Sequence, residues 1–150
     1  MPNVEIRLPH GRYDADARHA LARRLTTDLL AAEGIPENDT TRSLCWITIE
    51  ESAAGTWTVA GEPVEDRAEL HASVRITTFA SLLDDDRRRA LLQAVNTAIV
   101  DASGGDPLGG LGIWTVIEEV PDGHWGIAGN PIGIEELRLA NSGGVGSVSA

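Results

Sequence analysis

The chain has 150 residues, 42% of them apolar and 23% charged, a composition that predicts one folded domain. Its 23 acidic residues outnumber 12 basic ones and give a net charge of -11, which argues against a nucleic-acid partner because phosphates attract basic surfaces. No apolar run approaches the roughly 20 residues that span a bilayer, so we expect no membrane association. The single cysteine, Cys45, excludes an internal disulfide and a cysteine-based zinc cluster, and favours a cytoplasmic location.

The first half of the chain predicts a strand, a helix and a second strand. Apolar residues alternate with polar ones over residues 4–8, the period of a half-buried strand. Asp14 is suited to cap the helix that follows, which carries an apolar stripe and ends at Gly34. We expect the second strand over residues 42–50.

The second half predicts the same three elements in the same order. A strand is expected over residues 74–78, a helix from Asp84, and a last strand over 113–118. Residues 141–150 are rich in Gly and Ser, which predicts a flexible tail.

The two halves are copies of one another. Residues 45–51 recur as 113–119, and Trp57 has its counterpart in Trp125 at the same offset. Upstream of these segments the offset is two residues longer, so the second copy is shorter between its helix and its second strand. This pattern indicates an internal duplication.

The duplication predicts an α/β (α+β) fold of tandem βαβ repeats. We assign the repeats to residues 2–64 and 70–134 within one domain, 1–140. A crossover helix implies that the two strands of each repeat are parallel, which gives a four-stranded sheet with both helices on one face. We expect the other face to be apolar and to be buried by self-association.

The amino terminus carries a candidate catalytic group. Met1 precedes a small residue, Pro2, so removal of the methionine is expected to expose a secondary amine. All 12 basic residues are Arg, which leaves this amine as the only one available for base chemistry. An α-amine titrates near pH ~8, and burial lowers that value, so Pro2 is a candidate general base at neutral pH.

Pro2, then Gly11-Arg12, then a βαβ unit ending in Gly-x-Trp-x-x-x-Gly resembles the tautomerase superfamily. Residues 2–12 are similar to the opening of the 4-oxalocrotonate tautomerase branch, and 123–129 to its closing hairpin. The two-copy length resembles the malonate semialdehyde decarboxylase and cis-3-chloroacrylic acid dehalogenase branches. The resemblance implies a tautomerase (β-α-β) fold, a homotrimer, and one site per chain, because Ala72 stands where the first copy has Pro2.

The resemblance also implies roles for individual residues. Arg12 matches the carboxylate-binding arginine of the family, and Trp125 matches the apolar wall that keeps the amine neutral. Asp39 matches the catalytic acid of the decarboxylase branch, although its loop equally suits helix capping. Cys45 stands where a second arginine is found, so Arg42 and Arg75 are the remaining candidates for substrate binding.

The favoured hypothesis is an enzyme in which Pro2 transfers a proton between the keto and enol forms of a small enol or 2-oxo acid. A second is a decarboxylase or hydratase/dehalogenase of a small 3-oxo or unsaturated acid, with protonated Pro2 as acid and Asp39 orienting water. A third is a non-catalytic trimeric binding protein. The partner would be a small carboxylic acid or enol. No histidine spacing is typical of metal ligands, and we expect neither metal nor cofactor.

Overall fold

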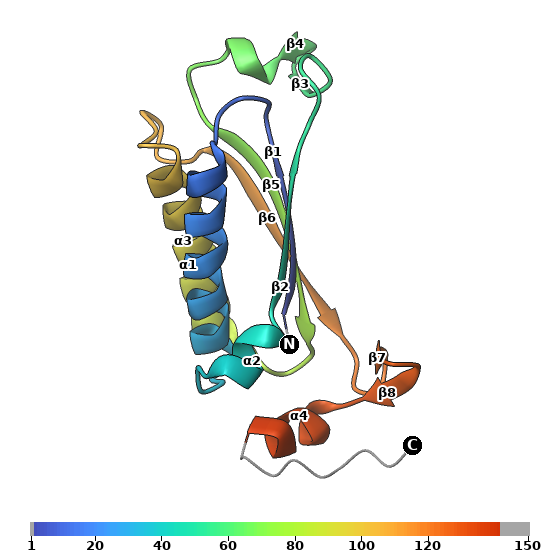
Figure 1. Ribbon diagram of the computed structural model, residues 1–150. Coiled ribbons are helices and arrows are strands. Elements are labelled where there is room, and N and C mark those ends of the chain that lie inside the picture. Colours follow the sequence, from blue (N-terminus) through green and yellow to red (C-terminus); the bar gives the residue numbers. More distant parts are fainter. Residues whose placement is uncertain (1, 142–150) are drawn as a thin grey trace.

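A four-stranded sheet with both long helices on one face forms the body of the protein (Figure 1). The computed structural model describes residues 2–141. The helices are α1 (Ala15–Glu33) and α3 (Asp85–Ala102). The strands of the sheet are β1 (Asn3–Leu8), β2 (Trp46–Glu51), β5 (His71–Phe79) and β6 (Gly112–Val120).

The strand order β2-β1-β5-β6 reproduces the duplication. β1 and β2 are parallel, as are β5 and β6, while the central pair β1 and β5 is antiparallel. The prediction of parallel strands within each repeat is therefore confirmed. At the start of β1, Asn3 pairs with Thr77 on one side and Trp46 on the other.

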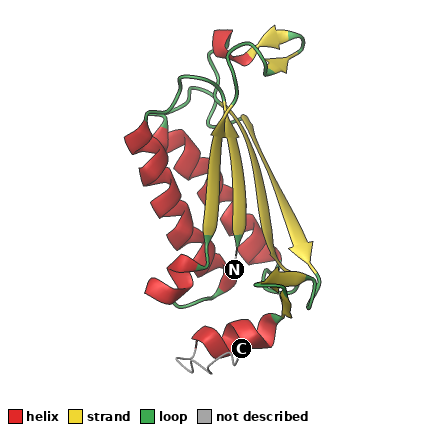
Figure 2. Ribbon diagram, turned by 45° about the vertical axis from the view of Figure 1, so that its right-hand side comes forward, coloured by secondary structure: helices red, strands yellow, loops and turns green. Residues whose placement is uncertain are grey.

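The remaining elements are short and lie around the ends of the sheet. A hairpin lies at each end, as Figures 1 and 2 show: β3–β4 at the end where α1 begins and α3 ends, and β7–β8 at the opposite end, near the amino terminus. These elements are α2 (Asp39–Ser43), β3 (Thr58–Val59), β4 (Glu62–Pro63), the 3-10 helix η1 (Val64–Asp66), β7 (Trp125–Ile127), β8 (Asn130–Ile132) and α4 (Ile134–Asn141).

The helix ends follow the predicted signals. The Asp14 carboxylate accepts a hydrogen bond of 2.8 Å from the Ala17 backbone, and Gly34 ends α1 in the left-handed conformation that glycine adopts without strain. Asp84 caps α3 in the same way. The apolar stripes of both helices pack on the sheet; the largest fully buried side chains in this core are Ile6, Leu8, Leu21, Leu25, Leu29, Ile76, Leu91 and Ile99.

Two boundaries differ from the predictions. The strand expected over 42–50 begins at Trp46, because Asn38 forms a capping box with Thr41 and thereby opens the short helix α2. The sequence reading also missed α4, which includes residue 141. The rest of the predicted tail lies outside the described residues.

The face of the sheet opposite the helices is mixed, so the prediction of an apolar face is wrong. Trp46 and Trp114 are 71% and 76% exposed there. Charged pairs share this face, for example Arg75 and Glu118, whose Nε and Oε1 atoms lie 3.5 Å apart. Strand alternation buries every second residue, and the residues between them include both tryptophans and charges.

Within residues 2–141, no helix is both long enough and apolar enough to cross a membrane.

Candidate active site

A pocket of about 730 Å³ lies at the amino-terminal end of β1. The pocket is open to solvent on one side. Pro2 is one of its lining residues and is buried. The residues that line it are Pro2, Asn3, Ser43, Leu44, Trp46, Thr77, Val120, His124, Trp125, Gly126, Ile127 and Ala128.

Local structure fixes the walls of this pocket. The Pro2 carbonyl accepts a hydrogen bond of 3.1 Å from the Trp46 backbone and thereby continues the β1–β2 pairing beyond Asn3. On the opposite side, the β7–β8 hairpin carries Trp125, whose ring centroid lies 5.3 Å from that of Phe79. The structure therefore brings Pro2 and Trp125 into one pocket, although 122 residues lie between them in the sequence.

The described residues that line this pocket include almost no ionisable side chains. Among the described residues that line it, none is Asp, Glu or Arg, and His124 is the one titratable side chain. The rest of its lining consists of two tryptophans, aliphatic residues, a glycine and three uncharged polar residues, Asn3, Ser43 and Thr77. Such an environment disfavours a charged amine and lowers its pKa.

A buried polar cluster lies on the helix side of Pro2. The Thr78 hydroxyl donates a hydrogen bond to the Glu33 carboxylate, and the two residues are 1% and 4% exposed. Burial raises the pKa of the Glu33 carboxyl; the positive charge of the chain's amino terminus and the Thr78 hydroxyl oppose that effect. Burial likewise raises the pKa of the Cys45 thiol, and the nearby charge of Glu33 adds to it. Glu33, Thr78 and Cys45 are therefore neighbours.

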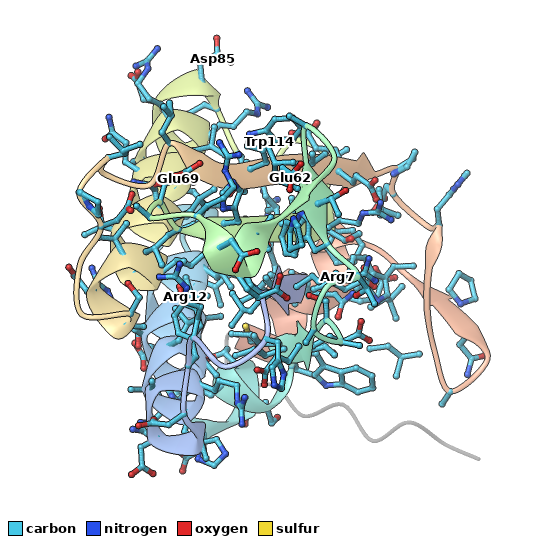
Figure 3. The ribbon with its side chains drawn as sticks, turned by 90° about the horizontal axis from the view of Figure 1, so that it is seen from above. Arg7, Arg12, Glu62, Glu69, Asp85 and Trp114 are labelled. Atoms are coloured by element: carbon cyan, nitrogen blue, oxygen red, sulfur yellow. The ribbon has the colours of Figure 1, made fainter. Side chains whose placement is uncertain are left out.

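Arg12 does not lie beside Pro2 within one protomer. The six residues of β1 separate them, a distance of roughly 20 Å at ~3.3 Å per residue. The Arg12 guanidinium instead donates a hydrogen bond of 2.7 Å to the Arg67 carbonyl. Figure 3 looks down onto this far end of the molecule, where Arg12 lies close to the start of α1.

Neither of the other predicted arginines lines the Pro2 pocket. The Arg42 guanidinium is hydrogen-bonded to the Glu37 carboxylate and lies 3.4 Å from the Thr27 hydroxyl. Arg75 projects from the exposed face of β5 and faces Glu118. Within one protomer, the predicted arginines and the proline amine are thus not assembled.

Asp39 has the position of a helix-stabilising residue. It is the first residue of α2, directly after the Asn38 cap, and its side chain is exposed. A carboxylate there interacts favourably with the helix dipole. Asp39 does not line the pocket.

The second repeat forms a counterpart pocket of about 960 Å³ at the opposite end of the sheet. It contains Ala72 where the first pocket has Pro2, and Trp114 and Trp57 where the first has Trp46 and Trp125. An internal alanine has no free amine, so the two pockets share a shape but not their chemistry.

Sequence reasoning missed Glu33 and Thr78. Both continue an apolar period: Glu33 follows Leu25 and Leu29 at the next four-residue step of the helix, and Thr78 follows Ile76 on the strand. A polar residue at an apolar position was the signal that could have found them. His124, which is exposed, also lines the pocket. Among the described residues, no group of three or more His, Cys, Asp or Glu gathers as a metal site.

One family model matches both repeats of this chain. The model described as "Tautomerase enzyme" matches residues 2–67 and again residues 73–134, once for each repeat. The chain belongs to the tautomerase family. None of the curated proteins matches its sequence.

Solved structures of similar fold include two-repeat tautomerases. A fused 4-OT, solved as a symmetric trimer, has 22% identity and a TM-score of 0.69, over 93% of this chain and 98% of that one. Pt0534, solved after inactivation by 2-oxo-3-pentynoate, has 16% identity and a TM-score of 0.71, over 90% and 98%. N1, a member of the cis-3-chloroacrylic acid dehalogenase family, has 19% and 0.70, over 91% and 89%. At these identities the likeness shows the tautomerase fold, and the reaction has to be argued from the site.

Proposed function

We propose that this tautomerase-family chain is an enzyme whose amino-terminal Pro2 amine transfers a proton within a small enol or 2-oxo acid. The observation that carries the proposal is the position of Pro2, which is buried in a pocket walled by Trp46 and Trp125 and free of Asp, Glu and Arg among its described lining residues. A desolvated secondary amine there stays unprotonated near neutral pH and is able to act as a base.

The step moves one proton from oxygen to carbon, and the double bond shifts from C=C to C=O. The lone pair of the Pro2 nitrogen takes the proton of the enol oxygen, the C=C electrons shift to restore a carbonyl, and the resulting ammonium returns the proton to carbon. Asn3, Thr77 and Ser43 supply hydroxyl and amide groups in the lining that suit hydrogen bonds to the substrate oxygens.

The missing cation is expected to come from a second copy of the chain. Among the described residues of one protomer, no arginine lines the pocket, while a carboxylate substrate needs one. We propose a homotrimer, the assembly named for the fused 4-OT of similar fold. The exposed faces of Trp46 and Trp114 suit burial in such an assembly. Light scattering should give three times the mass of the chain; a monomer at micromolar concentration would contradict the trimer.

The decisive experiment is covalent labelling followed by activity. 2-Oxo-3-pentynoate inactivates Pt0534, and its activated alkyne is open to addition by a neutral amine. We expect one molecule to be added per chain, on the nitrogen of Pro2, with loss of phenylenolpyruvate ketonisation. Labelling elsewhere with activity unchanged would exclude Pro2 as the catalytic amine.

A further inference from the structure

Glu33 is a carboxylic acid in a position that is unfavourable for one. It is the last residue of α1 and only 4% exposed. The carboxyl end of a helix carries partial negative charge, and the last turn of α1 has no basic residue to offset it. Burial of a carboxylate carries a further desolvation penalty. A side chain retained under both penalties calls for an explanation beyond packing.

The sheet register places this carboxylate next to the proline. Asn3 pairs with Thr77 in the antiparallel β1–β5 ladder, so the next residue pair outward is Pro2 opposite Thr78. Both are buried on the helix side of the sheet, where the Thr78 hydroxyl donates to the Glu33 carboxylate. One cross-strand neighbour thus joins the proline to the glutamate.

The opposite end of the sheet, around Ala72, serves as an internal comparison, because the same fold is built there without these polar groups. Its serine at the position of Glu33 donates a hydrogen bond of 2.7 Å to Val100 of its own helix, and the other three counterparts are apolar. The four residues around the amine are Pro2, Glu33 and Cys45 of the first repeat and Thr78 of the second, and their counterparts are Ala72, Ser103, Ile113 and Leu8. The fold therefore does not require the cluster, which occurs only at the end of the sheet where the amino-terminal amine lies.

We infer that Glu33 is the carboxylate partner of the Pro2 amine, a positioning residue that holds the ammonium form during proton transfer. The inference rests on the proposed function and deepens it. When the Pro2 nitrogen takes the substrate proton, an N–H bond forms and a positive charge appears in a pocket whose described lining residues include no Asp or Glu. The Glu33 carboxylate balances that charge without accepting the proton. The ammonium then transfers the proton to the substrate carbon.

Among the described residues, three further ionisable side chains lie near the Pro2 amine or near Glu33. They are Cys45 directly before β2, His124 before β7, and Arg42 of α2, whose charge acts on Cys45. Of these and Glu33, only the carboxylate and a thiolate are able to carry negative charge. Burial raises the pKa of the Cys45 thiol from an ordinary value that already lies above neutral pH, so the thiol is neutral there. Burial also raises the pKa of Glu33, but from a much lower ordinary value and against the positive charge of the amino terminus, so Glu33 is the group able to be the anion.

The test is a titration of the Pro2 nitrogen itself. Protein labelled with ¹⁵N-proline contains one proline whose nitrogen is an amine, and its chemical shift reports protonation. Removal of an opposite charge within about 4–6 Å lowers the pKa of an amine by about 1 to 3 units, so we expect that downward shift in Glu33→Gln. Glu62→Gln, which removes the same charge from an exposed residue of β4 at the far end, should leave the Pro2 titration unchanged.

An unchanged Pro2 titration in Glu33→Gln would overturn the inference. If that variant fails to fold, Glu33→Asp gives the same test, because it withdraws the carboxylate by one methylene group and should lower the Pro2 pKa by a smaller amount; no change there overturns the inference as well. A spectrum without a free proline amine would overturn the proposed function together with the inference. Unchanged titration with activity still lost in Pro2→Ala would remove the inference alone.

Discussion

The Thr78 hydroxyl of β5 donates a hydrogen bond to the Glu33 carboxylate at the end of α1, and both side chains are buried. This contact joins the helix layer to the sheet at the place where Pro2 begins β1. It also turns an otherwise apolar helix–sheet contact into one whose stability depends on pH.

The first prediction concerns that pH dependence. The folded-state pKa of Glu33 is raised by burial, whereas the unfolded value is about 4.3. Stability from this group is therefore fully present below the unfolded value and is lost as pH rises through the folded one. Glu33→Gln lacks this loss, so the free energy of unfolding of the variant minus that of the wild type should increase as pH rises above the unfolded value. Urea unfolding at several pH values measures this difference; a difference that stays constant with pH would contradict the prediction.

The single tyrosine provides a second pH prediction. Tyr13 is 5% exposed and its hydroxyl donates to the Ile99 carbonyl at 3.2 Å. Burial raises its pKa to about 12. Phenolate absorbance should therefore appear near pH 12 in the folded protein and near pH ~10 in denaturant. Because the folded pKa is raised, the stability that the neutral phenol supplies is lost between these two values. Tyr13→Phe should show no such transition, and titration of folded wild-type protein near pH ~10 would exclude the burial.

Arg12 allows a test of where the substrate's cation comes from. Arg12→Ala should lower phenylenolpyruvate ketonisation by about 10²-fold, the order of losing one charged stabiliser. Since Arg12 and Pro2 lie at opposite ends of β1, any such effect has to operate between protomers. Refolding a mixture of Arg12→Ala and Pro2→Ala chains should then restore part of the activity. Loss of activity in Arg12→Ala without restoration in the mixture would argue against a role shared between copies.

Asp39 is expected to affect stability but not the reaction. It lies in the first turn of α2 and outside the Pro2 pocket, so Asp39→Asn should cost about 0.3–1 kcal/mol of stability and leave ketonisation within twofold, about 0.4 kcal/mol in the barrier. Urea unfolding and initial rates measure the two quantities. Abolished activity, with a β-keto acid losing carbon dioxide faster than any enol is ketonised, would favour the decarboxylase hypothesis instead.

The sequence predicted the fold further than it predicted the site. Repeats, helix caps and strand pairing follow from local patterns, such as the Asp14 cap and the Gly34 end of α1, which the structure confirms. The site depends on contacts between distant segments. That Arg12 lies away from Pro2 follows from the length of β1, and that Glu33 lies beneath it follows from the β1–β5 register. A family motif aligns residues along the chain but does not state which protomer brings them together.

The central claim is that a free amine at Pro2 performs the proton transfer. The most direct measurement is phenylenolpyruvate ketonisation by wild-type protein and by a variant with one alanine inserted between Met1 and Pro2, in which the Pro2 nitrogen becomes an amide and cannot accept a proton. Intact mass should show that the methionine is removed from both. We predict measurable ketonisation by the wild type and a rate at the uncatalysed level for the insertion variant, with the same fold by circular dichroism. Equal rates for the two proteins would contradict the account.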